Sequence, residues 1–224
     1  ADGKLTIKTA DFEIDGANAQ TSVGPINFIG QDLNALGANW EVETQFTVRF
    51  NGGWQNASLA VWQADNNFFR TSITHNLNDG SIYTEQSKDN PTSAEGGRVQ
   101  SGNNQTILPN ASQPVTIRMR MARVNGSDTV TAQYRIIAPE SAATPDWVNF
   151  GGNANWVSSG GLALNTNPRR DVPGSLIGIM VQSNFPGTAG NFPYLGTPGT
   201  VEVDYFRVTP DPVTCETDAP TTTA

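Results

Sequence analysis

Apolar and polar residues alternate along much of this chain with the two-residue period of a β-strand. Residues 39–50 show the pattern most clearly, with apolar side chains at Trp40, Val42, Phe46, Val48 and Phe50. Such alternation predicts a strand with one buried face and one solvated face. Residues 114–124 repeat the pattern. Residues 174–182 are almost continuously apolar, which is typical of a strand covered on both faces.

The stretch 54–74 predicts a β-hairpin. Leu59 and Val61 alternate with Ala60 and Trp62, and the turn-forming Asp and Asn of residues 65–67 follow. Trp62 therefore lies on the face opposite Leu59 and Val61. Two interpretations remain open. Trp62 points outward as a platform for a ligand if the aliphatic face is the core, or it is itself core if the second sheet covers its face.

Turn-forming residues separate about twelve such segments at the spacing of hairpins. The 22 glycines and 14 prolines imply many turns, and no long window has the apolar spacing of an amphipathic helix. Further strands are expected at 4–8, 26–29, 80–86, 129–137 and 199–208. The sequence therefore predicts an all-β fold, an antiparallel two-sheet β-sandwich over residues 1–208. Residues 209–224 are rich in Pro and Thr and are expected to form a linker or tail.

Charge and composition narrow the possible partners. The net charge of −8, with 13 Lys and Arg, argues against nucleic acid and anionic membrane. No apolar run approaches the length of a membrane span. The abundance of Asn, Thr and Ser and the low Lys content suit a secreted bacterial protein. The single cysteine, Cys215, cannot form an internal disulfide and is either paired outside the chain or an inert thiol.

Catalytic chemistry has two candidate sets. Acids two residues apart on one strand, Glu41 with Glu43 or Glu202 with Asp204, could serve a glycosidase that needs two carboxylates. Such pairs on a wet strand face are usually only solvated. Sandwich polysaccharide lyases use Tyr with His or Arg, for which the candidates are His75, Tyr83, Arg118 and Arg120. Neither set matches a recognisable motif, so no residue is assigned a catalytic role.

Sugar binding asks less of a sequence. It needs aromatic faces against the C–H groups of a pyranose and a few polar side chains for its hydroxyls. The candidates are aromatic and polar residues in loops or on the outward sides of strands: Trp54, Trp62, Tyr83, Arg118, Arg120 and Tyr194. Packing is the simpler explanation for any one of them. Together they favour a binding face over an active site.

Several segments resemble concanavalin A-like (laminin-G-like) sandwich domains. The resemblance is carried by the hairpin NASLAVWQADNNFFRTSI, the pair VTIRMRMARVNGSDTVTAQYRI, the segment PDWVNFGG, and the closing strands LIGIMVQS and VEVDYFRV. It covers residues 38–208 and is strongest for the domain at the C-terminus of family 43 β-xylosidases and in many secreted bacterial carbohydrate-active proteins. It implies a concanavalin A-like jelly roll. The same sandwich carries lectins, binding modules, glycosidases and lyases, so the fold alone does not assign a function.

The resemblance also implies a structural calcium ion. Many sugar-binding sandwiches hold calcium where the first and last strands meet, and the matching stretches here contain Asp11, Glu13 and Asp204. Carboxylate oxygens are the ligands that calcium prefers. The alternative is that Asp204 caps backbone or pairs with an Arg.

The sequence thus predicts a carbohydrate-binding or accessory module of a secreted, multidomain polysaccharide-active enzyme. Its expected partners are a polysaccharide or oligosaccharide and neighbouring domains of the same polypeptide. One alternative is a catalytic β-sandwich, either a glycoside hydrolase or a polysaccharide lyase. Another is a structural domain without a sugar site.

Overall fold

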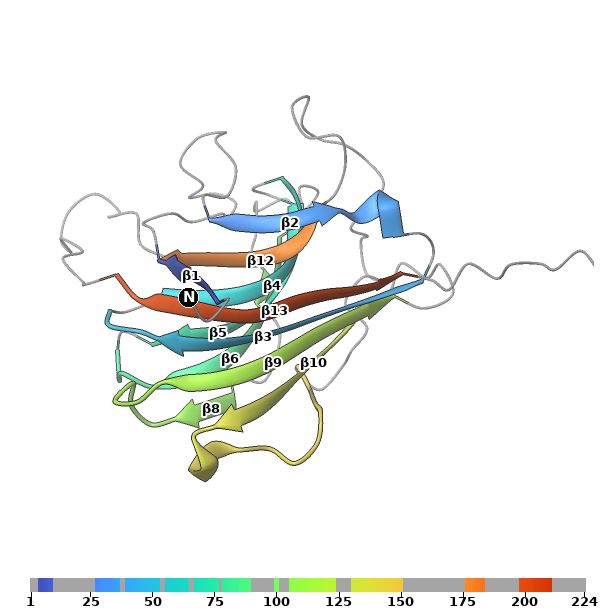
Figure 1. The fold of residues 1–224 in the computed structure, drawn as a ribbon. Helices are drawn as coiled ribbons and strands as arrows, with labels where there is room; N and C mark the ends of the chain where they lie inside the picture. The colour runs from blue at the N-terminus through green and yellow to red at the C-terminus, as the bar shows by residue number, and fades with distance from the viewer. Residues whose placement is uncertain are drawn as a thin grey trace, which may run out of the picture.

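A computed structural model of the chain describes residues 4–9, 27–36, 39–52, 55–64, 67–76, 78–89, 99–100, 105–123, 130–150, 176–183 and 198–210. These residues form two antiparallel β-sheets packed face to face (Figure 1). Two short 3-10 helices, η2 (Leu33–Leu36) and η3 (Glu140–Ala142), are the helices in the described part of the chain. The predicted all-β two-sheet sandwich is confirmed.

The first sheet, sheet A, contains six strands. In spatial order these are β1 (Leu5–Lys8), β13 (Thr200–Pro210), β3 (Trp40–Arg49), β9 (Val115–Arg123), β10 (Val130–Ala138) and β11 (Val148–Asn149). The last strand of the described chain therefore lies between the first strand and β3.

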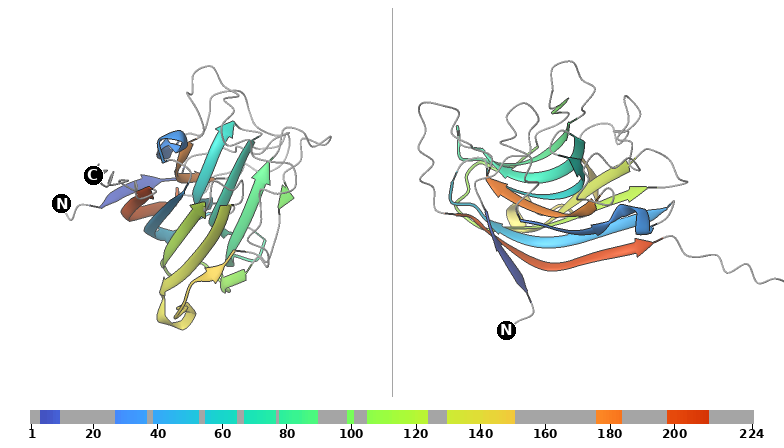
Figure 2. Two further views of the ribbon diagram at one scale, coloured as in Figure 1. Left: turned by 90° about the vertical axis from the view of Figure 1, so that its right-hand side faces the viewer. Right: turned by 90° about the horizontal axis from the view of Figure 1, so that it is seen from above.

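The second sheet, sheet B, contains seven strands. In spatial order these are β2 (Phe28–Asp32), β12 (Leu176–Ser183), β4 (Gln55–Ala64), β5 (Asn67–His75), β6 (Ile82–Asp89) and β7 (Val99–Gln100), and β8 (Gln105–Leu108) also pairs with β6. Figure 2 (right) shows the strands of sheet B bowing toward sheet A. The outer face of sheet B is therefore concave, and the outer face of sheet A is convex.

The main hydrophobic core lies between the sheets. Alternate residues of β3, including Val42 and Phe46, are fully buried, and the residues between them are only half-buried. Leu59 and Val61 of β4 belong to the same core from the side of sheet B. Each such side chain contributes about 1.5–3 kcal/mol through its burial. The apolar residues of the alternating pattern are thus those that point from each strand into the core.

Strand β12 is covered on both faces, as its continuous apolar run predicts. Ile177 and Val181 join the core between the sheets, and Met180 packs on the outer side of sheet B. Gly178 lies opposite Gly30 of β2. A Cβ atom at Gly178 would lie 2.2 Å from the backbone oxygen of Ile29, so this close approach of two strands requires glycine.

Trp62 belongs to a second, smaller hydrophobic cluster on the outer face of sheet B. Its buried members are Ala60, Trp62, Phe68 and Met180, with Phe28 and Leu176 packed against them. Trp62 is only 2% exposed. Each of the two interpretations of Trp62 is therefore partly right, because its side chain faces away from the main core and is nevertheless buried.

The domain boundary expected at residue 208 stays a prediction. Strand β13 continues to Pro210, two residues beyond the expected end at 208. Residues 211–224, with Cys215, lie outside the described residues, so the expected linker stays a prediction. Within the described residues, no helix is long and apolar enough to cross a membrane.

Candidate functional site

The concave outer face of sheet B carries an unusual row of polar side chains. Leu59 of β4 and Ile73 of β5 point toward the core. Because successive side chains of a strand point to opposite faces, their neighbours along each strand point outward. The strand register then places Ser58, Ser72 and Glu85 side by side across β4, β5 and β6. The neighbouring row is Asn56, Thr74 and Tyr83.

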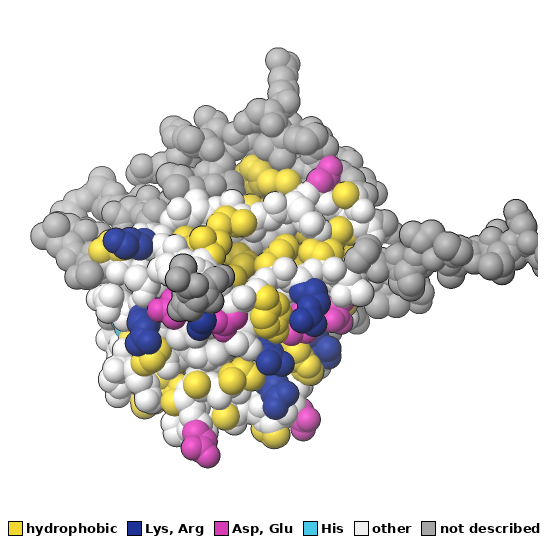
Figure 3. Space-filling view, viewed as in Figure 1, with side chains coloured by type: hydrophobic (Ala, Val, Ile, Leu, Met, Phe, Trp, Pro, Cys, Tyr) yellow, Lys and Arg dark blue, Asp and Glu magenta, His cyan; other side chains and the backbone are white. Residues whose placement is uncertain are grey.

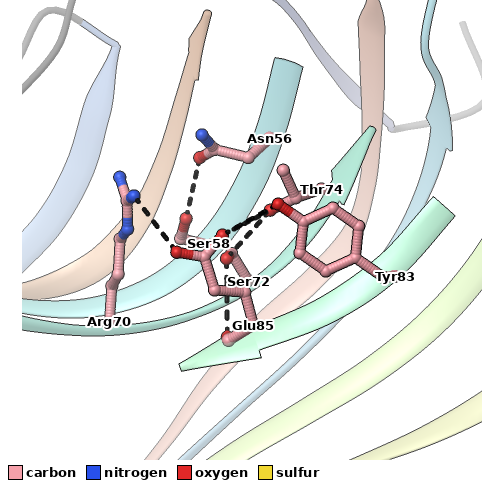
Figure 4. A network of polar contacts seen from close by, with 7 residues as sticks. All are labelled: Asn56, Ser58, Arg70, Ser72, Thr74, Tyr83 and Glu85. Carbon is pink, nitrogen blue, oxygen red and sulfur yellow. Dashed lines mark hydrogen bonds and ion pairs between the residues drawn. The ribbon is translucent and has the colours of Figure 1, made fainter. Parts of the chain in front are cut away.

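These residues form what we call the polar network: Asn56, Ser58, Arg70, Ser72, Thr74, Tyr83 and Glu85 (Figure 4). The Glu85 carboxylate is its centre. Thr74 Oγ1 and Tyr83 Oη each donate a hydrogen bond to Glu85 Oε2 at 3.4 Å, and Arg70 Nη2 lies 3.9 Å from Glu85 Oε1. These contacts bring a cation, an anion and two hydroxyl groups together on one face.

Serine side chains extend the polar network along the strands. Ser72 Oγ lies 3.2 Å from Thr74 Oγ1 and donates to the backbone oxygen of Glu85 at 3.5 Å. Ser58 Oγ donates to Asn56 Oδ1 at 3.1 Å. These side-chain contacts, at 3.1–3.4 Å, are longer than the usual 2.5–3.0 Å of a hydroxyl donor.

The polar network is buried. Tyr83 is its most exposed member at 6%, and the side chains of Arg70 and Glu85 are each about 1% exposed. Burying two charges costs several kcal/mol per ion, and their mutual attraction repays this only when the geometry is excellent. The hydrogen bonds from Thr74 and Tyr83 to Glu85 offset part of this cost.

Aromatic rings border the polar network on the same face. Trp62 pairs with Phe68 across β4 and β5, and the rings of Trp62 and Phe28 are 6.3 Å apart. The Cζ atom of Arg70 lies 5.7 Å from the centre of the Phe68 ring, which joins the two groups of residues. The face thus places buried aromatic rings beside the hydrogen-bonding groups of the polar network.

The structure divides the predicted sugar-binding residues between the two sides of the sandwich. Trp62 and Tyr83 lie on the concave face of sheet B. Arg118 and Arg120 alternate with buried Ile117 and Met119, so they lie on the convex face of sheet A. A single ligand cannot contact both pairs. Trp54 and Tyr194 lie outside the described residues.

The convex face has a hydrogen-bonded surface of its own. Arg120 Nε donates to Gln133 Oε1 at 2.7 Å, and the Cζ atom of Arg120 lies 4.3 Å from the centre of the Trp147 ring. Arg118 Nε donates to Gln45 Oε1 at 2.7 Å. These side chains are half-buried, and their contacts are shorter than those of the polar network.

The proposed calcium ligand Asp204 lies in a β-bulge of β13, between Val203 and Tyr205. Lys4 Nζ lies 2.8 Å from its Oδ1, and Gln45 Nε2 donates to its Oδ2 at 2.6 Å. Burial raises the pKa of the Asp204 carboxyl, but the hydrogen bonds from Lys4 and Gln45 outweigh this effect and hold the pKa below its usual value. Asp204 thus pairs with a lysine instead of the arginine considered above.

The calcium site itself stays a prediction. Asp11 and Glu13 lie outside the described residues. Among the residues that the structure describes, no group of three or more His, Cys, Asp or Glu side chains is arranged to hold a metal ion.

Several of the candidate catalytic residues form contacts with other groups of the protein. Glu43 accepts a hydrogen bond from Tyr205 Oη, and Glu41 Oε2 lies 3.9 Å from Arg120 Nη1. Both acids lie on the convex face. His75 Nδ1 lies 2.6 Å from the backbone oxygen of Gly52, which ties the end of β5 to the turn after β3. The lyase set is likewise divided, because Tyr83 lies on the opposite side of the sandwich from Arg118.

The titration of the Tyr205 hydroxyl tests its hydrogen bond to Glu43 on the convex face. Burial and the hydrogen bond to the Glu43 carboxylate raise the pKa of Tyr205 to about 12, against an ordinary value of about 10. The folded state therefore holds this proton more tightly than the unfolded state. We expect the free energy of unfolding to fall as the pH rises from about 10 to about 12.

The pKa of Tyr205 is measured from the tyrosinate absorbance as the pH is raised, as the difference between the unmodified protein and Tyr205→Phe. Glu43→Gln is expected to lower the pKa of Tyr205. The control Glu41→Gln should leave it unchanged, since Glu41 does not contact Tyr205. An unchanged Tyr205 titration in Glu43→Gln would contradict the assignment.

Sequence reasoning missed most of the polar network: Asn56, Ser58, Arg70, Ser72, Thr74 and Glu85 were not among the predicted residues. A usable pattern was present. The outward positions of β4 include Asn56 and Ser58 before Trp62, and pairing β5 in the register of the hairpin sets Thr74 opposite Asn56 and Ser72 opposite Ser58.

Of the comparisons with known proteins, the one with solved structures finds the same fold. No family model and no curated protein matches the chain. Among solved structures, GH43 BlXynB from Bacillus licheniformis matches with a TM-score of 0.61 and 11% identity, over 93% of this chain and 33% of that chain. Xylan β-1,4-xylosidase from Bacillus halodurans C-125 matches with a TM-score of 0.57 and 14% identity, over 92% and 33%.

A third solved structure is matched over most of its own length. A functionally unknown protein from Saccharomyces cerevisiae has a TM-score of 0.50 and 13% identity, and the match covers 94% of this chain and 89% of that one. The chain thus spans about a third of the length of the two Bacillus chains and most of the yeast chain. Identities this low show the fold alone. The chain is a two-sheet β-sandwich, similar in fold to a part of these GH43 and xylosidase structures.

Proposed function

We propose that this domain is a non-catalytic accessory module of a secreted polysaccharide-active enzyme and that it binds a neutral glycan on the concave face of sheet B. The observation that carries the proposal is the polar network, which lies beside the aromatic cluster on one face. The similarity to parts of xylosidase structures supports the accessory role.

The chemistry of the polar network suits a sugar. Ser, Thr and Tyr hydroxyls both donate and accept hydrogen bonds, as sugar hydroxyls do. Arg70 and Glu85 add charge-assisted hydrogen bonds, which are roughly twice as strong as neutral ones. The two charges compensate each other, so the polar network attracts no net charge of either sign. A neutral glycan is therefore the favoured ligand.

The same face favours binding over hydrolysis. Glycoside hydrolysis commonly uses two carboxylates on either side of the scissile bond. The polar network contributes one, that of Glu85, and this carboxylate already contacts Thr74, Tyr83 and Arg70. Its surroundings resemble a recognition site for hydroxyl groups.

Burial of the polar network has a kinetic consequence. A glycan can reach these side chains only if the face opens, so association should be slower than for a preformed exposed site. Stopped-flow measurements with increasing glycan should show an observed rate that approaches a plateau, which is set by the opening step.

The test combines binding with an activity assay. The protein is run on affinity gels and in calorimetry with soluble neutral arabinoxylan, xyloglucan, β-glucan and galactomannan, and the same mixtures are assayed for reducing ends and unsaturated products. Binding to at least one of them without product is expected. Release of product would show an enzyme, and no binding to any of them would favour a purely structural domain.

Two threonine variants locate the face. Thr74→Val removes a hydroxyl that donates to Glu85 and should weaken glycan binding about fivefold, the value of one typical hydrogen bond. The matched control is Thr47→Val on sheet A, where Thr47 Oγ1 lies 2.9 Å from Thr116 Oγ1. The control should bind as the unmodified protein does. Equal losses in both variants would exclude the concave face as the site.

A further inference from the structure

Positive charge gathers on the convex face of sheet A. Seven of the chain's 13 Lys and Arg occupy outward positions there: Lys4, Lys8, Arg49, Arg118, Arg120, Arg135 and Arg207. Among the described residues, the outward strand positions of this face hold four acids: Glu41, Glu43, Glu202 and Asp204. The seven cations and four acids at these described positions sum to +3, in a chain whose total charge is −8. Figure 3, which views this face, shows the Lys and Arg side chains spread across it.

Two arginines on this face lie directly opposite each other. Arg118 of β9 and Arg135 of β10 are partners in the strand register. Arg118 Nε donates to Gln45 Oε1 at 2.7 Å, and Arg135 Nε donates to the backbone oxygen of Thr144 at 3.2 Å. Among the described residues, neither guanidinium forms an ion pair with a carboxylate.

This arrangement is unfavourable without a ligand. Like charges directly opposite each other destabilise a pair of strands. The neighbouring cations differ, because Arg120 lies 3.9 Å from Glu41 and Lys4 lies 2.8 Å from Asp204. Each guanidinium of the Arg118–Arg135 pair retains terminal N–H donors in the fork geometry that matches a carboxylate.

We propose that Arg118 and Arg135 form a carboxylate-binding site and that the convex face binds an acidic polysaccharide rich in uronic acids. The proposal rests on the proposed function, since it assigns this glycan-binding module a second ligand on a separate face. A carboxylate placed between the two guanidinium groups would remove their repulsion and accept hydrogen bonds from both.

The composition of the face favours a polysaccharide over a protein. Every outward position of β3, from Glu41 to Arg49, is polar or charged, and β9 adds Thr116 next to Arg118. Protein interfaces concentrate aromatic and apolar residues at their centre. Here the centre offers amides and hydroxyls, such as Gln45, Gln133 and Tyr205, which suit the hydroxyl groups between successive carboxylates of a polyuronate.

The negative charge of the whole chain does not prevent this binding. Charges are screened over about 8 Å at physiological ionic strength, so a bound carboxylate responds mainly to the convex face. Binding should weaken as salt is added, unlike the binding of a neutral glycan to the concave face.

The test compares polygalacturonate with its methyl ester, which has the same backbone without the charge. Calorimetry and affinity electrophoresis with the full chain should give binding to polygalacturonate that is about tenfold tighter than to the ester and that weakens between about 50 and about 300 mM NaCl. Equal binding of the two polymers would overturn the proposal. So would binding of acidic proteins or anionic vesicles in place of polygalacturonate.

Arginine variants distinguish binding at Arg118 and Arg135 from general electrostatic attraction to the convex face. Arg118→Gln/Arg135→Gln should bind polygalacturonate about tenfold more weakly. Arg49→Gln, which removes a positive charge from the same face at the other end of β3, should change binding about twofold or less. Equal losses in the two variants would show general electrostatic attraction and overturn the site. A melting temperature no lower than that of the unmodified protein confirms that the arginine variants are folded, since removal of like charges should not destabilise the strands.

The two proposed glycan sites can be tested independently of each other. The arginine double variant should keep its neutral-glycan binding, and Thr74→Val should keep its polygalacturonate binding. Loss of neutral-glycan binding alone would contradict the function proposed for the concave face. Loss of polygalacturonate binding alone would contradict the site proposed here.

Discussion

Replacing either member of the Arg70–Glu85 pair alone is expected to destabilise the domain far more than replacing both. Each single change leaves an uncompensated charge among side chains that are about 1% exposed. Breaking a buried ion pair in this way costs about 3–5 kcal/mol, whereas an uncharged pair of similar volume is often neutral or stabilising. For a domain of this size the single variants should melt about 6–20 °C lower.

Thermal and urea unfolding of Arg70→Met, Glu85→Gln and the double variant measure the coupling directly. The double variant should be more stable than either single variant and should have lost glycan binding. The matched control is the Lys4–Asp204 pair, which is more exposed, so Lys4→Met should cost less than about 1 kcal/mol. Additive effects of Arg70→Met and Glu85→Gln would show that the two charges do not stabilise each other.

Trp62→Ala is expected to destabilise the domain by about 3–5 kcal/mol, as for a large aromatic residue in a core. The reason is its position among Phe28, Phe68 and Met180, where it is 2% exposed. The loss should appear as a lower midpoint in urea. A weakened interaction with a glycan in this variant would therefore not by itself show stacking on the indole.

The matched control is Trp147→Ala on the convex face. Trp147 is half-buried and its ring contacts the guanidinium of Arg120, a contact worth about 0.5–2 kcal/mol. If Trp62→Ala costs no more than Trp147→Ala and still abolishes glycan binding, Trp62 is an accessible platform in solution and its packing is not as described here.

The strands with one buried and one open face were predictable from the sequence. Strands β3 and β9 alternate strictly because every second side chain enters the same core. The apolar run of β12 was equally informative, because this strand is buried on both sides. One short strand that pairs with β6 escaped this reasoning. Strand β8 (Gln105–Leu108) has a single fully buried residue, Leu108, so no periodic pattern marks it.

The candidate site was harder to predict for a geometric reason. Alternation shows that Trp62 and Arg118 point away from the main core, but a sandwich has two outer faces, and alternation does not distinguish them. Strand order assigns β4 to sheet B and β9 to sheet A. The polar network escaped notice because Ser, Thr and Glu at outward positions look like ordinary solvated residues, and nothing local in the sequence reveals that this face is buried.

The strand order also bears on how the chain acquires its structure as it is synthesised. Strand β13 lies between β1 and β3, and β12 lies between β2 and β4, so each sheet receives a late strand between two early ones. Until residues 200–210 have left the ribosome, β1 and β3 present unpaired edges to other nascent chains. Such non-local pairing slows folding and prolongs that exposure. The sandwich must therefore close after synthesis has passed its last strand, and it cannot grow sheet by sheet from the N-terminus.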